Sequence, residues 1–336
     1  MSERPLVQMS NLVKEFPVTG GIFQRQIATV NAVAGVDLSI NRGETVGLVG
    51  ESGCGKSTLG RMLVRLLEPT SGTIVFDGED ITHIKGKKLK PFRRRAQIIF
   101  QDPYSSLDPR TQVGNSIAEG LKLHGVSNSD ERQERVTKML ELVGLEGHHA
   151  GRFPHEFSGG QRQRIGLARA LVLEPDFVVA DEPVSALDVS VQAQVLNLLK
   201  ELQSELNLTL LFVAHNLAVV EHISDRVAVM YLGRIAEITD RESLYRNPLH
   251  PYTEALLSAI PIPDPDRPRN RTILQGEVPS PIDPPSGCFF HPRCPIAVKG
   301  LCDVEVPSLQ QSETSADHLA SCHVRTGSYK HQDSSK

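Results

Sequence analysis

The chain has 336 residues, a formal net charge of −4 and a pI of about 6.3. This length allows one large domain plus a smaller one. The near-balanced charge excludes the broad basic surface of nucleic-acid-binding proteins, so we expect no nucleic-acid partner. No apolar run reaches the roughly 18 residues that span a bilayer, and the N-terminal residues lack the apolar core of a signal peptide. We therefore expect a cytoplasmic protein.

The first hundred residues predict short strands around one helix. Residues 5–16 and 28–40 alternate apolar and polar side chains, as half-buried strands do. The apolar run "ETVGLVG" ends in Gly50 and predicts a strand that leads into a loop. The stretch after it, "KSTLGRMLVRLLE", has the periodicity of a helix. Two further strands are predicted at "GTIVFDG" and "AQIIFQ".

The middle of the chain alternates helices and strands. A helical pattern runs from about Val113 to Gly144, and the apolar runs "DFVVADEP" and "LTLLFVAH" predict strands on either side of the helical stretch "SVQAQVLNLLKELQSEL". Such alternation predicts a parallel sheet with helices on both faces.

The character of the sequence changes after about residue 240. "HPYTEALLSAI" predicts one more helix, and the eight prolines between Pro261 and Pro285 exclude a regular helix or a central strand there. The last residues, "TGSYKHQDSSK", have the composition of a loose tail.

Gly50, Gly55, Lys56 and Ser57 match the phosphate-loop pattern G-x-x-x-x-G-K-S/T. The glycines let backbone N–H groups wrap phosphates, Lys56 neutralises the β- and γ-phosphates, and Ser57 ligates Mg²⁺. A glycine-rich turn before a helix is the plain alternative. The strand predicted before the loop and the helix predicted after it favour the phosphate loop.

Two acidic residues follow a buried strand in "FVVADEP". Asp181 and Glu182 stand at the carboxyl end of that strand, where ligands of open parallel sheets bind. We expect Asp181 to hold the Mg²⁺ shell and Glu182 to activate a water for attack on the γ-phosphate. His215 follows the next apolar strand in the same way. A lone histidine there is more often structural, but the shared position favours a sensor of the γ-phosphate.

A second anion site begins at "FSGGQ", where a serine and two glycines open a helix. Together with the other motifs, this stretch resembles the ATP-binding-cassette (ABC) family. The motifs occur in the family's order over about residues 5–240 and read "GESGCGKST", "FQDP", "FSGGQ", "VVADEP", "SALD" and "VAHN". In that family two cassettes face head to tail. The resemblance thus implies that this second loop binds the ATP of another subunit.

The same resemblance implies a fold and a division of the chain. The expected fold is α/β, a P-loop NTPase (RecA-like) core with an antiparallel β subdomain and an inserted α-helical subdomain at about 102–165. Residues 1–242 form the nucleotide-binding domain, and 243–336 form a small irregular C-terminal extension.

The family's site residues carry over by motif. The ATP-binding set is Phe16, Gly50, Ser52, Gly53, Gly55, Lys56, Ser57 and Thr58. The Mg²⁺ set is Ser57, Gln101 and Asp181, and the catalytic set is Glu182, His215 and Gln101. The signature that acts in trans is Ser158, Gly159, Gly160 and Gln161, with Asp188 in the adjoining D-loop. Phe23 rivals Phe16 for stacking on adenine, because "PVTGGIFQRQ" makes this loop long. Phe157 and Asn216 depart from the commoner Leu and Asp, but neither carries an assigned role.

Longer stretches, among them "HPYTEALLSAIP" and "VPSPIDPPSGCFFHPRCP", resemble the dipeptide/oligopeptide permease ATPases over nearly the whole chain. The resemblance implies an ATPase subunit of a peptide importer, peripheral on the cytoplasmic face of the inner membrane. Its partners would be a second ATPase subunit (a copy or a paralogue), two transmembrane permease subunits and, indirectly, a solute-binding protein. Nickel, glutathione or another small solute is the alternative cargo. A non-transport ABC ATPase is a further alternative, although too few residues separate Lys56 from Asp181 for the coiled coil of the DNA-repair type.

Four of the five cysteines crowd into the extension. Cys288, Cys294, Cys302 and Cys322 have the spacing Cys-x5-Cys-x7-Cys-x19-Cys. Four thiolates can hold an iron–sulfur cluster or a zinc ion, and the resemblance favours a 4Fe–4S cluster over Zn²⁺. Free thiols are the plain alternative.

Other residues near the cysteines bear on this site. His291 and His323 flank them and could replace a ligand, whereas Cys54 is a small residue of the phosphate loop. The cysteines are far in sequence from every ATP motif, so we expect a structural or docking role for them and none in hydrolysis.

Overall fold

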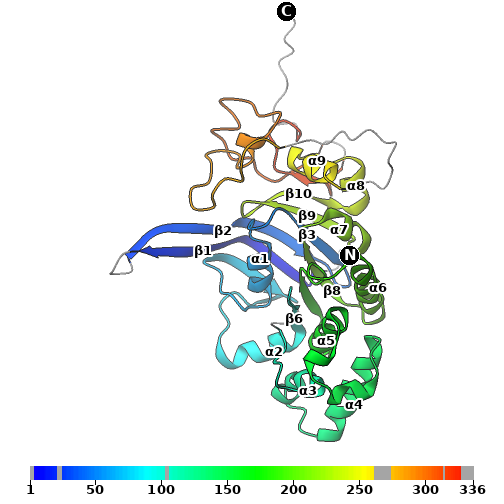
Figure 1. Ribbon diagram of the computed structural model, residues 1–336. Helices are drawn as coiled ribbons and strands as arrows, with labels where there is room; N and C mark the ends of the chain where they lie inside the picture. Colours follow the sequence, from blue (N-terminus) through cyan, green and yellow to red (C-terminus); the bar gives the residue numbers. More distant parts are fainter. Residues whose placement is uncertain (1–3, 21–24, 103–105, 261–273, 313–314, 327–336) are drawn as a thin grey trace, which may run out of the picture.

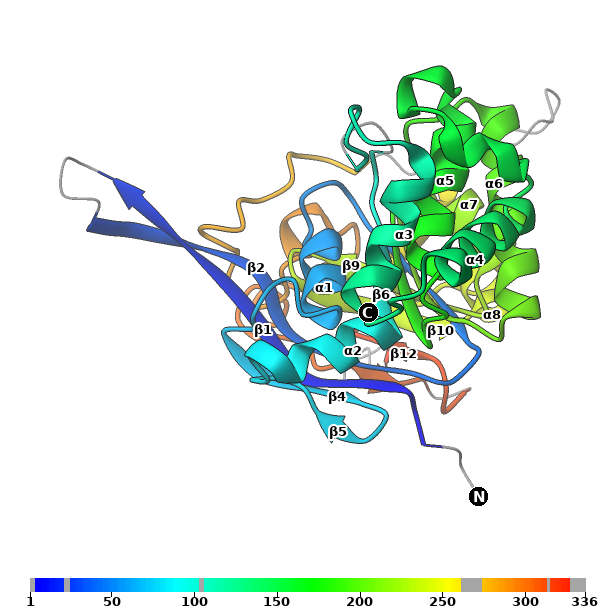
Figure 2. The ribbon, with the colours of Figure 1, turned by 90° about the horizontal axis from the view of Figure 1, so that it is seen from below.

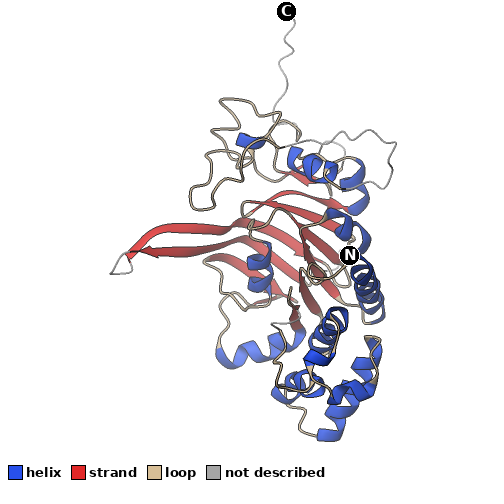
Figure 3. Ribbon diagram, viewed as in Figure 1, coloured by secondary structure: helices blue, strands red, loops and turns tan. Residues whose placement is uncertain are grey.

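The computed structural model describes residues 4–20, 25–102, 106–260, 274–312 and 315–326. Two sheets organise this part of the chain, one antiparallel and one mostly parallel (Figures 1 and 3). Among the described residues, we find no helix whose length and apolar character would let it cross a membrane.

The antiparallel sheet has the strand order β2-β1-β4-β5. Its members are β1 (Val7–Gly20), β2 (Arg25–Ile40), β4 (Ser71–Phe76) and β5 (Glu79–Asp80). β1 and β2 form a long hairpin that projects from the body of the molecule (Figure 1). The predicted strands are confirmed, although β1 continues past Phe16 to Gly20. Phe23 lies outside the described residues.

The second sheet has eight strands in the order β11-β12-β10-β9-β3-β8-β7-β6. They are β3 (Thr45–Val49), β6 (Ala96–Ile99), β7 (Phe177–Asp181), β8 (Thr209–Ala214), β9 (Arg226–Tyr231), β10 (Arg234–Asp240), β11 (Gln310–Gln311) and β12 (Leu319–Ala320). The strands from β6 to β9 run parallel. Because β3, β7 and β8 are buried along their whole length, their sequences are continuous apolar runs. Their carboxyl ends meet at one edge, and the residues that follow them are brought together there.

Helices cover both faces of this sheet (Figure 2). They are α1 (Lys56–Leu63), α2 (Leu89–Arg95), α3 (Val113–Leu123), α4 (Ser129–Leu142), α5 (Gly159–Leu171), α6 (Val189–Glu205), α7 (Leu217–Ile223), α8 (Arg241–Arg246) and α9 (Pro251–Ser258). Short 3-10 turns lie at Gly86–Lys88, Gly147–Gly151, Pro154–Glu156 and His291–Arg293. The α1 helix is shorter than predicted, because Val64 caps it and Arg65 adopts a left-handed φ of 54°.

The side chains of the eight-stranded sheet pack into two hydrophobic cores, one on each face. Phe177 and Val179 of β7 point into the core beneath α1 and the antiparallel sheet. Val178 and Ala180 point into the other core, with α3 to α8. The alternation along one strand confirms a sheet covered on both faces. The helices α3 and α4 fall within the predicted insertion at 102–165. The division at residue 242 stays a prediction.

The C-terminal extension is attached to the parallel sheet. Its strand β12 pairs antiparallel with β10, where Glu237 faces Ala320 and Ile238 faces Leu319. The extension was expected to be irregular, and its two short strands, β11 and β12, correct that expectation. The proline-rich stretch at 261–273 lies outside the described residues.

A buried carboxylate fixes the same attachment. Glu237 is fully buried and accepts hydrogen bonds from the backbone N–H groups of Leu249 (2.7 Å) and His250 (2.9 Å). His318, from the extension, lies 2.6 Å from Glu237 through Nε2. Burial lowers the pKa of the neighbouring His250 to about 4, so this ring is neutral at physiological pH.

Glu237→Ala should loosen the extension, because the N–H groups of Leu249 and His250 and the ring of His318 then lose their common partner. We expect a loss of about 3–5 kcal/mol in unfolding free energy, measured by urea denaturation. Glu242→Ala removes an exposed ion pair of α8 and serves as the control, with a change within about 0.5 kcal/mol. Equal midpoints for the two variants would contradict the anchoring role of Glu237.

Candidate active site

The loop between β3 and α1 folds around its own lysine. Lys56 is buried, and its Nζ donates to the carbonyl oxygens of Gly50 (2.8 Å) and Glu51 (3.0 Å). Ser52 and Gly53 are exposed, while Ser57 and Thr58 are half-buried at the start of α1. The ammonium group is thus held within a loop whose outer residues face solvent.

Two glycines of this loop touch other backbone segments. A Cβ at Gly50 would lie 2.1 Å from the carbonyl oxygen of Met230, and one at Gly55 would lie 2.0 Å from that of Ala32. Gly55 also has a φ of 107°, in the left-handed region that only glycine adopts readily. The loop is therefore wedged between β2 and β9, and its shape excludes side chains at both positions.

Ser57 and Asp181 converge at the carboxyl edge of the sheet. The Ser57 hydroxyl donates to Oδ1 of Asp181 over 2.7 Å. Asp181 ends β7, and burial raises the pKa of its carboxyl, against the Ser57 hydrogen bond and the charge of Arg61. A hydroxyl and a carboxylate are oxygen ligands of the kind that Mg²⁺ takes beside phosphates, so the residues present fit that ion.

Glu182, Gln101 and His215 gather beside this pair. Gln101 follows β6 and donates from Nε2 to Oε2 of Glu182 over 3.2 Å. His215 follows β8 and places Nδ1 3.2 Å from the same oxygen. The backbone of Glu182 is left-handed, with a φ of 47°, and its N–H donates to Val213 over 3.0 Å. Three side chains predicted from separate motifs are thus brought to one point, and Glu182 is at its centre.

The signature residues form the cap of α5. Ser158 Oγ accepts from the N–H of Gln161, whose Oε1 accepts from the N–H of Ser158. Gly160 approaches α6, where an added Cβ would lie 2.4 Å from Val191. α1 and α5 lie apart in both Figures 1 and 2. No hydrogen bond or ion pair among the described residues joins Ser158–Gln161 to residues 50–58.

The remaining predicted residues occupy simpler positions. Asp188 caps α6 by accepting from the N–H of Val191 (3.0 Å), and this bond and one from Ser190 lower its pKa. Phe16 is half-buried in β1, and Lys14 Nζ lies 5.1 Å from its ring centroid. Its ring therefore keeps an exposed part on which a base could stack.

The four cysteines of the extension come close together. The N–H of Cys288 donates to the carbonyl oxygen of Cys302 over 2.8 Å. Burial raises the pKa of Cys288 to about 11 and that of Cys294 to about 12, and the other thiols contribute to both shifts. Cys322 lies near enough to affect the same two pKa values. The four cysteines thus lie near one another, and burial disfavours the thiolate forms of Cys288 and Cys294.

The flanking histidines contact backbone carbonyls instead. His291 Nδ1 lies 2.9 Å from the carbonyl oxygen of Cys288, and His323 Nε2 lies 3.0 Å from that of Glu305.

The phosphate loop touches two residues that the motifs did not indicate. Tyr252 of α9 accepts from the N–H of Glu51 over 2.8 Å, and Arg293 pairs with the carboxylate of Glu51. The cysteine segment is far in sequence from the ATP motifs, yet these contacts place it beside the phosphate loop. No pattern marks Arg293 in the sequence except its position just before Cys294.

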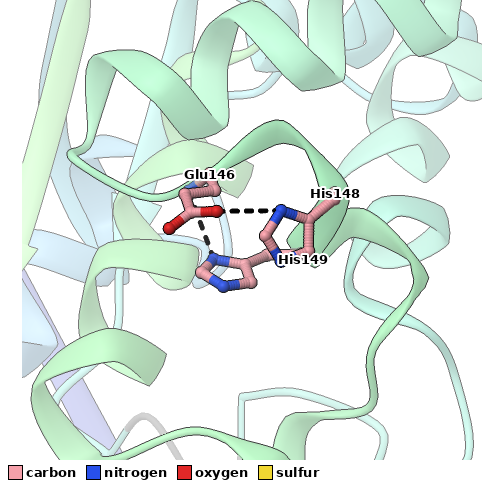
Figure 4. Close-up of side chains that lie close together, drawn as sticks. All are labelled: Glu146, His148 and His149. Atoms are coloured by element: carbon pink, nitrogen blue, oxygen red, sulfur yellow. Dashed lines mark hydrogen bonds and ion pairs between the residues drawn. The ribbon is translucent and has the colours of Figure 1, made fainter.

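Figure 4 shows another cluster, made of Glu146, His148 and His149. Their possible ligand atoms lie within 4.8 Å of one another. His149 Nδ1 accepts from the N–H of Glu146 (3.2 Å), and His148 Nδ1 lies 2.9 Å from the Glu146 carboxylate. These contacts cap the 3-10 turn Gly147–Gly151. We therefore explain the cluster as a cap and assign it no metal.

Comparison with known proteins decides the family. Residues 33–185 match the family model "ABC transporter", and residues 236–302 match "Oligopeptide/dipeptide transporter, C-terminal region". The chain is 51% identical to the oligopeptide transport ATP-binding protein AppF of Bacillus subtilis, over 96% of this chain and 98% of that protein. The chain belongs to the ABC transporter family. It is an ABC-type ATPase, and ATP is its substrate.

Further similar proteins and structures support the same family assignment. A putative peptide import ATP-binding protein of Brucella ovis is 54% identical over 96% of this chain and 98% of its own length. Among solved structures, the fold is similar to the dimeric ATP-binding cassette MJ0796 in a post-hydrolysis state with ADP and phosphate. That match has a TM-score of 0.62 and 28% identity, and covers 70% of this chain and 98% of that one. CbiO1 from Clostridium perfringens matches with a TM-score of 0.63 and 29% identity, over 73% and 92% of the two chains. The predicted P-loop NTPase fold is confirmed.

Two alanine variants of the ABC phosphate loop can distinguish a steric clash from backbone strain. They are Gly55→Ala and Gly53→Ala, and the quantity compared is the loss in unfolding free energy. Both residues have positive φ, but an added Cβ at Gly53 meets nothing within 4 Å. Left-handed strain costs each variant about 1–2 kcal/mol. The clash with Ala32 should cost Gly55→Ala about 1–3 kcal/mol more. Denaturant unfolding measures both, and equal losses would show that the loop yields to a side chain at Gly55.

Proposed function

We propose that this ABC ATPase hydrolyses ATP with Glu182 as the general base. The observation that carries the proposal is the contact of both Gln101 and His215 with one oxygen of Glu182, beside the Ser57–Asp181 pair. A base must lie within hydrogen-bond reach of the water it activates, and neighbouring polar groups must orient it. The cluster offers such an oriented carboxylate at the edge of the phosphate loop.

Each residue of the cluster has one task in this mechanism. Gly50–Thr58 bind the phosphates through backbone N–H groups, and Lys56 neutralises their charge. Ser57, Asp181 and Gln101 would hold Mg²⁺, which when bound screens the phosphate oxygens. Glu182 takes a proton from the attacking water, and His215 positions the γ-phosphate. Phe16 stacks on adenine. These assignments are proposals for each residue.

The signature serves a second subunit in this proposal. Ser158 is exposed at the start of α5, and in the described part of the chain no hydrogen bond or ion pair joins Ser158–Gln161 to the phosphate loop. A helix N-terminus favours an anion, and the ADP-bound relative MJ0796 is a dimer. We infer a head-to-tail dimer, with a copy or a paralogue, in which the signature and Asp188 of one subunit complete the ATP site of the other.

The dimer would drive a peptide importer. The C-terminal match and the names of the relatives support this cargo class. Two transmembrane permease subunits would receive the dimer on the cytoplasmic face of the membrane, and a solute-binding protein would deliver peptides to them. The domain division at residue 242 belongs to the same proposal, with the extension specific to importers of this type.

Glu182→Gln should stop hydrolysis and keep ATP bound. The amide cannot accept the proton of the attacking water, and loss of a general base commonly lowers the rate by about 10²–10⁴-fold. Release of phosphate by the complex with its membrane subunits measures the rate. Size-exclusion chromatography with ATP should show a trapped dimer.

The matched control is the double variant in which Ser158→Arg is added to Glu182→Gln. A large cation at the start of α5 should prevent the two subunits from closing into the dimer. A wild-type rate of ATP hydrolysis by Glu182→Gln would refute the assignment of Glu182 as the general base. A trapped dimer that survives Ser158→Arg would refute the role of the signature in trans.

We further propose that Cys288, Cys294, Cys302 and Cys322 bind a 4Fe–4S cluster. Two buried thiols, Cys302 and Cys322, lie close to two half-buried ones, and this grouping supports a shared ligand. Backbone N–H groups also point at the sulfurs, as Val298 does to Cys302 Sγ over 3.4 Å, and such bonds stabilise thiolates of clusters. A single Zn²⁺ would bring its sulfurs to about 4 Å of one another. Among the described residues, no three of these sulfurs lie within 4.8 Å of one another.

Purification without oxygen should give iron and sulfide in the protein, with absorbance near about 400 nm. Cys294→Ser should lower the iron content, and Cys54→Ser should leave it unchanged. Burial raises the pKa of the free thiols, so metal binding must release protons and should tighten as pH rises. Zinc in place of iron would support the alternative. Four freely reactive thiols and neither metal would refute the site.

A further inference from the structure

Arg293 reaches from the extension to the phosphate loop. Its two terminal nitrogens donate to the two carboxylate oxygens of Glu51, over 2.7 and 3.0 Å. The side chain of Arg293 is only 7% exposed, and that of Glu51 is 28% exposed. Bidentate pairing in a buried setting fixes both partners more firmly than a surface ion pair does.

Glu51 in turn supports the lysine of the loop. Its carbonyl oxygen accepts from Lys56 Nζ over 3.0 Å and from the N–H of Cys54 over 3.3 Å. Its own N–H donates to the hydroxyl of Tyr252. The backbone of Glu51 therefore sets where the lysine lies, and Arg293 and Tyr252 hold that backbone from outside the loop.

The charge of Glu51 makes this contact matter for ATP. A carboxylate directly after Gly50 stands within a loop that binds phosphates, and like charges repel. Arg293 neutralises the carboxylate and keeps it turned toward the extension. Without Arg293, Glu51 would be an unpaired anion beside the incoming phosphates.

The cysteine segment fixes the position of Arg293. Arg293 lies between Cys288 and Cys294, and its N–H donates to the carbonyl oxygen of Phe290 over 3.0 Å. The ring of Phe290 is buried against Tyr231 and Tyr252, with centroids 5.3 and 5.5 Å apart. Tyr231 also lies 3.5 Å from Arg293 Nη1 through its hydroxyl. The guanidinium that pairs with Glu51 is thus positioned by the short segment that runs between two of the cysteines.

We propose that Arg293 is a positioning residue for ATP, through which the state of the four-cysteine site sets the ATP affinity of the phosphate loop. The inference rests on the proposed function, since it takes this loop to be the ATP site. It assigns to the extension a part in nucleotide binding that its sequence position does not indicate.

Arg293→Met in the full-length chain tests the proposal. The substitution keeps most of the side-chain volume and removes the charge. We expect labelled ATP to bind about tenfold more weakly, equivalent to about 1.4 kcal/mol, with KM raised and kcat unchanged. Adding Glu51→Gln should restore the affinity, because no unpaired anion remains. Arg293→Lys should retain most of it. Arg246→Ala, which breaks an exposed ion pair of the same extension, is the control with wild-type affinity.

Cys294→Ser tests the link to the cysteines. It should weaken ATP binding in the wild-type background and have no effect in the Glu51→Gln background. Glu51→Gln alone should bind ATP at least as tightly as the wild type, which keeps the proposal testable if Arg293→Met does not fold. Unchanged affinity in Arg293→Met, no rescue by Glu51→Gln, or weaker binding by Glu51→Gln alone would each overturn the proposal. Lys56→Ala must abolish binding. If Lys56→Ala still binds ATP, then the loop is not the ATP site. That result would refute the proposed function itself, and it would be distinguishable from a failure of the Arg293 proposal alone.

Discussion

The whole site depends on a phosphate loop with no space for side chains at two positions. The carbonyl oxygens of Met230 and Ala32 lie directly against Gly50 and Gly55, so neither position leaves space for a side chain on this path of the loop. That path starts α1 at Lys56 and brings Ser57 to Asp181 at the end of β7. Because the parallel strands share one carboxyl edge, the residues after β6, β7 and β8 then assemble around the same point.

Much of this arrangement could be predicted from the sequence, for a physical reason. Strands buried on both faces are continuous apolar runs, and the motif residues stand directly at their ends, so Asp181, Glu182 and His215 could be assigned to one edge. The hairpin of β9 and β10 was not predicted, although a signal exists. Apolar runs flank Leu232 and Gly233, which have φ values of 42° and 80°, as a tight hairpin requires.

The contacts of the extension could not be predicted, because they leave no periodic pattern. Strand β12 has two residues, and Arg293 meets Glu51 across 242 positions of sequence. Pairs so far apart are determined by tertiary packing, here by Phe290 between two tyrosines. Distance in sequence from the ATP motifs was therefore a poor guide to where the cysteine segment lies in the fold.

The two short strands of the extension also have a consequence for solubility. Strand β10 has seven residues, five of them buried in an unbroken row, and without β12 its backbone N–H and C=O groups would form an open sheet edge. Long apolar edges pair readily with other chains and lead to aggregation. β12 covers part of that edge, and the sheet then ends at Gln310–Gln311, an exposed polar strand too short to template another chain. The extension thus protects the cassette from edge-to-edge association while it reaches the phosphate loop.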